Sequence, residues 1–200
     1  MSYQTIERIG QGEYKSRGSK FYSFLHPINN LDSYRHLISI YRSEYPEACH
    51  VCSAYRLFIN SRIDEQGVDD GEPRGSSGQP ILNQLKRNNL INVGIYVVRI
   101  FGGTLLGIPG LIESYSNAAL ISIDSIKHLD WFPTKNISLR FPYEQQGIVQ
   151  SIIKEFYGVI TKKDFSEDVC IHISINENKI DSFNQKIKEI SSGRIKPFIN

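Results

Sequence analysis

The amino-acid sequence predicts an α+β protein of two domains. Segments in which apolar and polar residues alternate, as in strands, are interspersed with segments whose apolar residues recur at helical spacing. The length of 200 residues suits one large or two small domains. A short stretch with Trp131 and Pro133 lies between the two sets of elements and is typical of a linker. We therefore expect one domain over residues 1–133 and a second over residues 134–200.

The elements of the second domain are the most regular in the chain. Val169, Ile171 and Ile173 alternate with polar residues, as in a half-buried strand, and Gly158 is expected as the left-handed residue that ends the first helix. The expected elements are, in order, a strand (136–142), a helix (143–157), two strands (159–163 and 169–175), a helix (178–191) and a strand (195–199). This β-α-β-β-α-β order is that of ferredoxin-like domains.

The first domain alternates strands, helices and two long loops. Asp32 is expected to cap a helix that Pro46 stops, and Pro80 and Pro109 each suit the first turn of a helix. Residues 61–79 form a loop of nineteen residues, a length that is usually functional or disordered. Residues 102–110 form a second, glycine-rich loop. The expected elements around these loops are strands at 14–27, 51–60 and 92–101 and helices at 32–45, 80–90 and from 109 onward.

Composition excludes several classes of protein. The 23 Lys and Arg residues nearly balance the 21 Asp and Glu residues, so the chain does not coat nucleic acid through bulk charge. The apolar run 90–101 is too short and too interrupted to cross a bilayer, and the first twenty residues contain no secretory signal. Three cysteines are too few for a disulfide scaffold. These features predict a cytoplasmic protein with no membrane partner.

Four motifs carry a resemblance to a known family. Residues 69–82 read DDGEPRGSSGQPIL, and residues 92–119 read NVGIYVVRIFGGTLLGIPGLIESYSNAA. Together with RGSKF at 17–21 and CHVCSAY at 49–55, they resemble the signature of the IMPACT/YigZ-type family, DDGEPSGTAGRPIL followed by NVxVVVxRYFGGxKLGxGGLxRAYxxAA. The match spans most of residues 13–120, and the motifs occur in the family's order.

The resemblance implies both a fold and a biological setting. It implies a first domain with the βα fold of elongation factor G domain IV and of a small-subunit ribosomal protein, and a second domain like another ferredoxin-like domain of that factor. It also implies a link to translation, because eukaryotic relatives regulate translation through the activator of a kinase that targets an initiation factor. RNA or ribosome binding is the role suggested for the bacterial branch by likeness of fold, which is an analogy.

The two glycine-containing loops predict a binding cleft. Backbone N–H groups of the second loop and of the helix after it could contact an anion, or the glycines could serve only tight turns and close packing. Leu105 and Glu113 replace basic residues of the family pattern, and Arg74 and Pro109 also depart from it, which weakens a phosphate-binding role. The residues expected in the cleft are Lys20, His50, Asp69, Asp70, Gly71, Glu72, Arg99, Gly102, Gly103, Gly107 and Gly110.

The charged residues in and near these loops allow two interpretations, metal binding and a structural role. Asp69, Asp70 and Glu72 could hold Mg²⁺ or Ca²⁺, although their spacing is not that of an EF-hand. The structural alternative is that Asp70 caps the turn at Gly71, whereas Glu72 pairs with Arg99 or Arg74. Arg99 ends an otherwise apolar strand, so we expect it either to be paired or to contact a ligand. Lys20 could reach the same surface.

Cys49, His50 and Cys52 invite two further readings. The C-x₂-C spacing is half of a zinc site, but no second pair follows, and Cys170 lies in the other domain. A cysteine nucleophile with His50 as base lacks a third orienting group. Buried cysteines that pack as small apolar side chains are the expected outcome.

The sequence therefore favours a non-enzymatic cytoplasmic module that binds RNA, the ribosome or a translation-related protein. We expect no catalytic residue, no metal and no cofactor. A metal-dependent hydrolase that acts on a small phosphorylated or peptide substrate in the same cleft is the alternative, and a protein adaptor is a third reading. Residues 1–133 carry thirteen basic and thirteen acidic residues, and residues 134–200 carry ten and eight, so RNA contact should be weak and biased to the second domain.

Overall fold

The computed structural model describes residues 3–195 and 197–199. The chain divides into two compact units, Met1–Trp131 and Phe132–Asn200, here called the first and second unit. Both units combine helices with an antiparallel sheet, so the mixed α/β, two-domain architecture predicted from the sequence is confirmed.

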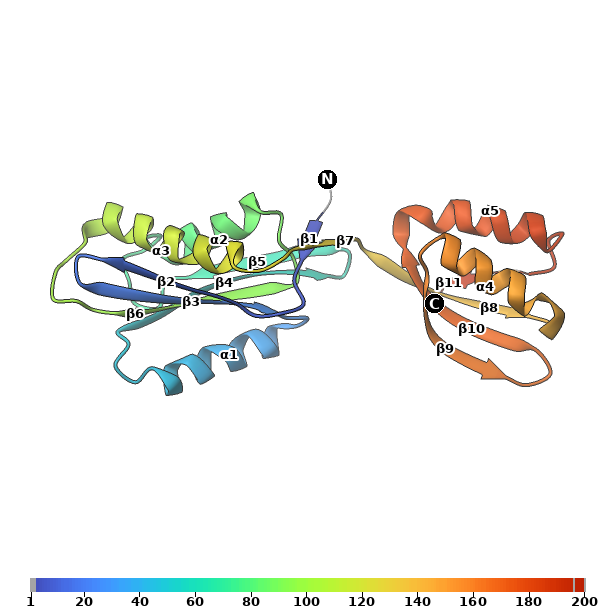
Figure 1. Cartoon of the computed structure of the whole chain (residues 1–200), viewed down its shortest axis with the longest axis horizontal. Coiled ribbons are helices and arrows are strands. Elements are labelled where there is room, and N and C mark those ends of the chain that lie inside the picture. The colour runs from blue at the N-terminus through green and yellow to red at the C-terminus, as the bar shows by residue number, and fades with distance from the viewer. Residues whose placement is uncertain (1–2, 196, 200) are drawn as a thin grey trace. The chain divides into compact units, whose positions relative to one another are not determined.

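The first unit is a five-stranded antiparallel sheet covered by helices on both faces (Figure 1). The strands lie in the order β2 (Gly10–Ser16), β3 (Ser19–Pro27), β6 (Val93–Ile100), β4 (His50–Ile59) and β5 (Arg62–Val68). Helices α2 (Gly78–Arg87) and α3 (Gly107–Asp124) cover one face, and α1 (Leu31–Glu44) covers the other. A separate pair joins β1 (Tyr3–Thr5) to β7 (Leu129–Trp131).

The central strand β6 explains why this sheet is covered on both faces. Ile95 and Val97 pack into the core beneath α2 and α3, whereas Tyr96 and Val98 pack into the core beneath α1. Because successive side chains of a strand point to opposite faces, a strand buried on both sides must be apolar throughout. This burial on both faces explains the many β-branched residues of strand β6.

Two polar edge strands were missed in the sequence. The expected strand at 14–27 is a hairpin, in which β2 and β3 meet at a turn whose residues Arg17 and Gly18 have φ of 44° and 84°. The first part of the expected loop at 61–79 is β5, which pairs with β4. Edge strands form hydrogen bonds with a neighbouring strand on one side only. Because they carry many polar residues, the alternation of apolar and polar residues that marks a strand is weak in their sequence. The true loop, here called the carboxylate loop, is Asp69–Ser77.

The cap of α1 also differs from the prediction. Asn30, not Asp32, is the N-cap, because its Oδ1 accepts a hydrogen bond from the backbone N–H of Ser33 at 2.7 Å. Asp32 lies in the first turn, where a carboxylate interacts favourably with the helix dipole.

The second unit is a four-stranded antiparallel sheet in the order β11-β8-β10-β9, with both helices on one face (Figure 1). Its apolar core gathers the inward residues of β8 and β10 against the two helices. The order of strands and helices follows the prediction. The elements are β8 (Thr134–Phe141), α4 (Gln146–Glu155), β9 (Val159–Phe165), β10 (Val169–Asn176), α5 (Ile180–Ile190) and β11 (Phe198–Ile199), with short 3₁₀ turns at Tyr143–Gln145 and Glu177–Lys179.

The end of α4 corrects one detail of the prediction. The left-handed residue is Tyr157, with φ of 57°, and the next residue, Gly158, donates its backbone N–H to the carbonyl of Ile153 at 2.8 Å. The helix therefore ends one residue earlier than a glycine at the left-handed position would require. Of the expected last strand at 195–199, residue 196 lies outside the described residues. Within the described part of the chain, no helix is both long enough and apolar enough to cross a membrane.

Candidate functional site

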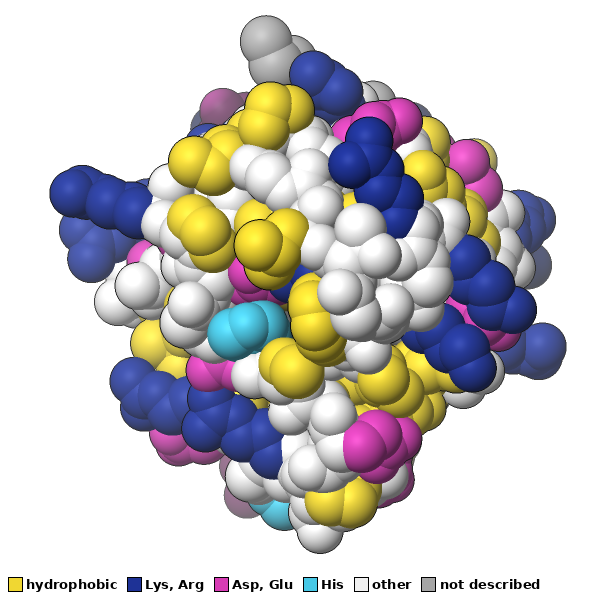
Figure 2. Space-filling model, turned by 90° about the vertical axis from the view of Figure 1, so that its left-hand side faces the viewer, with side chains coloured by type: hydrophobic (Ala, Val, Ile, Leu, Met, Phe, Trp, Pro, Cys, Tyr) yellow, Lys and Arg dark blue, Asp and Glu magenta, His cyan; other side chains and the backbone are white. Residues whose placement is uncertain are grey.

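A pocket of about 420 Å³ lies at one end of the first unit. Figure 2 shows hydrophobic side chains gathered around a hollow at this end, with a histidine beside it. Four segments form the walls: the start of β4, the carboxylate loop, the end of β6 with the glycine loop that follows (residues 101–106), and the first turns of α3. The lining residues are Cys49, His50, Glu72, Pro73, Arg99, Phe101, Leu105, Leu106, Gly107, Ile108 and Leu111.

A buried ion pair forms the polar part of this pocket. Nη1 of Arg99 lies 2.6 Å from Oε1 of Glu72, and the two side chains are 7% and 4% exposed. The hydroxyl of Tyr115 donates to the same oxygen at 2.7 Å. Burial, with Cys52 and Glu72 beside it, raises the pKa of Tyr115, so the phenol stays protonated and donates. Of the two partners that the sequence left open for Glu72, the structure selects Arg99.

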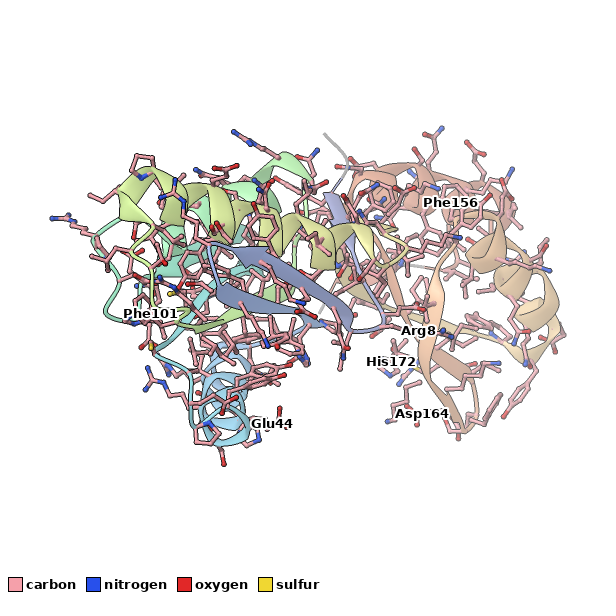
Figure 3. All side chains as sticks on the ribbon, turned by 60° about the vertical axis from the view of Figure 1, so that its left-hand side comes forward. Arg8, Glu44, Phe101, Phe156, Asp164 and His172 are labelled. Atoms are coloured by element: carbon pink, nitrogen blue, oxygen red, sulfur yellow. The ribbon has the colours of Figure 1, made fainter. Side chains whose placement is uncertain are left out.

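The guanidinium of Arg99 is only partly satisfied. Its carbon lies 5.6 Å from the ring centroid of Phe21 and 5.7 Å from that of Phe101, which is labelled in Figure 3. Its Nε is buried and has no hydrogen-bond partner among the described residues. A buried donor without an acceptor costs about 1–3 kcal/mol. The ion pair therefore leaves part of the hydrogen-bonding capacity of this buried guanidinium unused.

Asp69 organises the carboxylate loop. Its carboxylate accepts hydrogen bonds from the backbone N–H groups of Gly75 (2.7 Å), Ser77 (3.1 Å) and Gly78 (2.8 Å) and from the hydroxyl of Ser77 (2.8 Å). Partial burial opposes ionisation, but the N–H groups of Gly75 and Gly78 and the Ser77 side chain hold the pKa of Asp69 below its ordinary value. Asp69 therefore joins the loop to the start of α2.

Asp70 joins the same loop to strand β4 and helix α1. One oxygen accepts from the backbone N–H of Val51 at 2.7 Å, and the other forms an ion pair with Arg42 of α1. Asp70 and Gly71 both have positive φ, 48° and 89°. The expected cap on the turn at Gly71 is thus replaced by contacts with β4 and α1. The three carboxylates are adjacent in sequence but take separate partners, and no group of three His, Cys, Asp or Glu residues suited to a metal occurs among the described residues.

His50 has one ring nitrogen fixed by the carboxylate loop. Its Nδ1 lies 2.7 Å from the backbone carbonyl of Asp70, and because a carbonyl only accepts, Nδ1 carries the proton. In the tautomer with the proton on Nδ1, Nε2 is an acceptor. His50 lines the pocket from the start of β4.

The neighbouring cysteines differ from each other. Cys52 is buried, its Sγ donates to the carbonyl of Asp69 at 3.0 Å, and burial raises its pKa to about 12, so it stays a thiol. Cys49 is exposed, which corrects the expectation that both cysteines are buried.

The glycine loop presents apolar rather than basic side chains. Leu105 is 82% exposed, Ile108 54% and Phe101 43%. Gly102 is required by packing, because a Cβ there would lie 1.9 Å from the carbonyl carbon of Gly18, and Gly103 is required by its φ of 85°. The glycines thus shape the loop.

The expected cleft residues therefore divide into four groups. His50, Glu72, Arg99 and Gly107 line the pocket. Asp69, Asp70 and Gly71 support its wall from behind through the contacts above. Lys20 is exposed on β3 next to the inward-facing Phe21, so it points to the other face of the sheet. The other three expected residues, also outside the lining, are Gly102, Gly103 and Gly110.

Sequence reasoning missed the apolar lining. Leu105 was interpreted only as a lost basic residue, and no place in the cleft was expected for Leu106, Ile108 or Leu111. The sequence pattern that could have indicated this lining is the helical spacing of Ile108, Leu111 and Ile112 in the first turns of α3. Ile108 and Ile112 are exposed, and Leu111 is buried.

A second group was also missed, on the helix-free face of the second unit. The hydroxyl of Ser138 lies 2.8 Å from Nδ1 of His172, whose Nε2 lies 3.5 Å from Asp164; Figure 3 labels the last two. These residue types resemble a hydrolytic triad, but 3.5 Å exceeds a hydrogen bond and Asp164 pairs with Lys162 at 2.9 Å. The cluster is best explained as cross-strand pairing.

Comparisons with known proteins agree along most of the chain. The Impact N-terminal domain matches residues 17–123, and a domain of unknown function, DUF1949, matches residues 139–194. The chain is 29% identical over 184 residues to an IMPACT family member of Haemophilus influenzae, covering 92% of this chain and 89% of that protein. It is 26% identical over 178 residues to the IMPACT family member YigZ of Escherichia coli, covering 88% and 87%.

A solved structure, described as that of a hypothetical protein, shares the fold. It superposes with a TM-score of 0.68 at 23% identity and covers 98% of this chain and 96% of its own.

Proposed function

This chain belongs to the IMPACT family, and from that premise we propose that it is a non-enzymatic binding protein of translation, with the ribosome or a translation factor as its partner. One observation carries the proposal. The pocket of the first unit has apolar walls, and its one buried carboxylate, Glu72, is engaged by Arg99 and Tyr115. The engagement of Glu72 by Arg99 and Tyr115 favours recognition of a partner over acid–base chemistry by this carboxylate.

The alternative, a metal-dependent hydrolase, has weaker support. Such an enzyme would use the carboxylates of the DDGEP segment as ligands or as a general base. Asp69 already accepts from three backbone N–H groups, and Asp70 accepts from Val51 and pairs with Arg42. These contacts favour a structural role for both residues.

The setting in translation rests on the family. Eukaryotic relatives regulate translation, as the sequence resemblance implies. We also propose that the first unit has the fold of elongation factor G domain IV and that the second is ferredoxin-like. The sheet order β11-β8-β10-β9 with two helices on one face supports the second assignment. A cytoplasmic location is part of the proposal, because an exposed free thiol such as Cys49 persists best in a reducing compartment.

Co-sedimentation tests the proposal. The purified full chain is centrifuged through sucrose gradients with 30S, 50S and 70S particles, and separately incubated with purified initiation and elongation factors. We expect a stable association with one of these partners at physiological salt. Gel shifts with tRNA and single-stranded RNA at two salt concentrations identify any contribution from phosphate contacts. Absence of all association, together with turnover of a phosphorylated or peptide substrate that EDTA abolishes and an added divalent cation restores, would replace the proposal with the hydrolase.

A further inference from the structure

We infer that the pocket of the first unit binds an apolar segment of a polypeptide, holding one large apolar side chain and the peptide group beside it. The inference rests on the proposed function and names the chemistry of its partner. It commits to a polypeptide, not to RNA.

The mouth of the pocket is apolar where a loop would ordinarily be polar. Leu105, Ile108 and Phe101 are substantially exposed, and Leu106 and Leu111 continue the apolar surface inward as buried side chains. Single exposed apolar side chains are normal, but a group of them around a hollow marks an interaction site. The volume of about 420 Å³ suits one large side chain with its backbone, and it falls within the range of ligand pockets.

The charges of the pocket disfavour an anion. Arg99 is the one arginine or lysine in the lining, and Glu72 neutralises it at 2.6 Å. A phosphate or a carboxylate would meet the Glu72 carboxylate without a free cation to offset it. RNA recognition depends on phosphate contacts, for which this lining has no unpaired lysine or arginine.

A neutral peptide group matches the remaining polar atoms. Arg99 lines the pocket, and only Nη1 of its guanidinium makes a hydrogen bond to a described side chain, so the guanidinium can donate to a carbonyl oxygen. His50 donates through Nδ1 to Asp70 and presents Nε2 as an acceptor, which suits an amide N–H. One acceptor and one donor are the two polar groups of a peptide unit. The pocket is therefore complementary to a peptide group next to an apolar side chain.

The probe is a phage-displayed library of random dodecapeptides selected on the immobilised full chain. We expect the enriched peptides to share a large apolar residue. One of them, labelled for fluorescence anisotropy, should bind Ile108→Asp and Leu105→Asp at least tenfold more weakly than the unmodified chain. Both positions are exposed, and circular dichroism checks the folding of each variant. Ile9→Asp is the matched control, since Ile9 is 50% exposed but outside the lining, and it should bind unchanged.

A second variant tests the peptide-group contact. His50→Asn keeps a side-chain N–H near the Asp70 carbonyl but removes the acceptor at Nε2. It should bind the peptide about three- to tenfold more weakly, as expected for one lost hydrogen bond. N-methylation of the amide beside the apolar residue should cost the same factor on the unmodified chain and nothing further on His50→Asn.

Peptides without an apolar consensus, equal binding to Ile108→Asp, or tight binding of an oligouridine dodecamer that Ile108→Asp abolishes would each overturn the inference. Ribosome or factor association that survives Ile108→Asp overturns it but leaves the proposed function intact. Peptide binding without any association with ribosomes or translation factors supports the pocket chemistry and overturns the proposed function.

Discussion

Arg99 Nη1 and Glu72 Oε1, 2.6 Å apart inside the first unit, join the end of strand β6 to the carboxylate loop. The pair is almost wholly buried, and it ties the loop that carries three acidic residues to the strand from which the glycine loop continues. The shape of the pocket thus depends on one contact between residues 27 positions apart.

Removal of the Glu72 charge should be strongly destabilising. In Glu72→Gln the Arg99 guanidinium stays buried without its counter-charge, and breaking a buried pair costs about 3–5 kcal/mol. Urea denaturation measures the loss in the free energy of unfolding. Glu113→Gln, at an exposed position of α3, is the control and should change stability by less than about 0.5 kcal/mol. The double variant Glu72→Gln with Arg99→Met should regain most of the loss; a single-variant loss below 1 kcal/mol would contradict the buried pair.

The Tyr115 hydroxyl should stabilise the folded protein through its hydrogen bond to Glu72. Tyr115→Phe removes the donor at 2.7 Å from the carboxylate, and hydrogen bonds to charged groups contribute about 1.5–3 kcal/mol. Thermal and urea unfolding should both record the loss. Tyr14→Phe serves as the comparison, because Tyr14 is only half-buried, and it should be near neutral. Equal effects of the two substitutions on the free energy of unfolding would show that the hydroxyl of Tyr115 does not contribute to stability.

Asp69 should make stability depend on acid pH. Its pKa is lowered in the folded state, so its contribution is complete above the ordinary value of 3.8 and is lost as the pH falls through the folded-state pKa. Urea denaturation from pH 7 to pH 3 should therefore give a shallower acid dependence for Asp69→Asn than for the unmodified chain. At pH 7 the variant should lose about 1–2 kcal/mol, as for a lost helix cap. Parallel pH profiles would contradict this role, and Asp32→Asn, which is exposed, controls for general charge effects.

Two glycines should respond with opposite signs. Gly102→Ala places a Cβ 1.9 Å from the backbone of Gly18, so the glycine loop must move away from β3, and both stability and peptide binding should fall. Gly147→Ala lies in α4 with no heavy atom within 4 Å of the new Cβ, and it should stabilise the second unit by about 0.5–1 kcal/mol. Differential scanning calorimetry measures both. Tolerance of Gly102→Ala would mean that the loop does not need the close approach.

Much of the fold followed from periodicity. The β-branched run around Tyr96 and Val98 and the alternation around Ile171 and Ile173 predicted their strands because both patterns reflect burial. The edge strands β2 and β5 escaped prediction because each has one neighbour and exposes polar residues.

By itself, the sequence determined the family and the two-part α/β organisation, because both are written in local pattern or in motifs. It could not determine which partner each acidic residue takes. The carboxylate of Asp69 contacts residues up to 9 positions away, whereas that of Asp70 contacts Arg42 at 28 and that of Glu72 contacts Arg99 at 27. Only the folded sheet brings the last two pairs together. The tertiary structure also determined that the pocket is apolar. Leu105, interpreted from the sequence as a lost positive charge, lies with Ile108 and Phe101 around the mouth of the pocket.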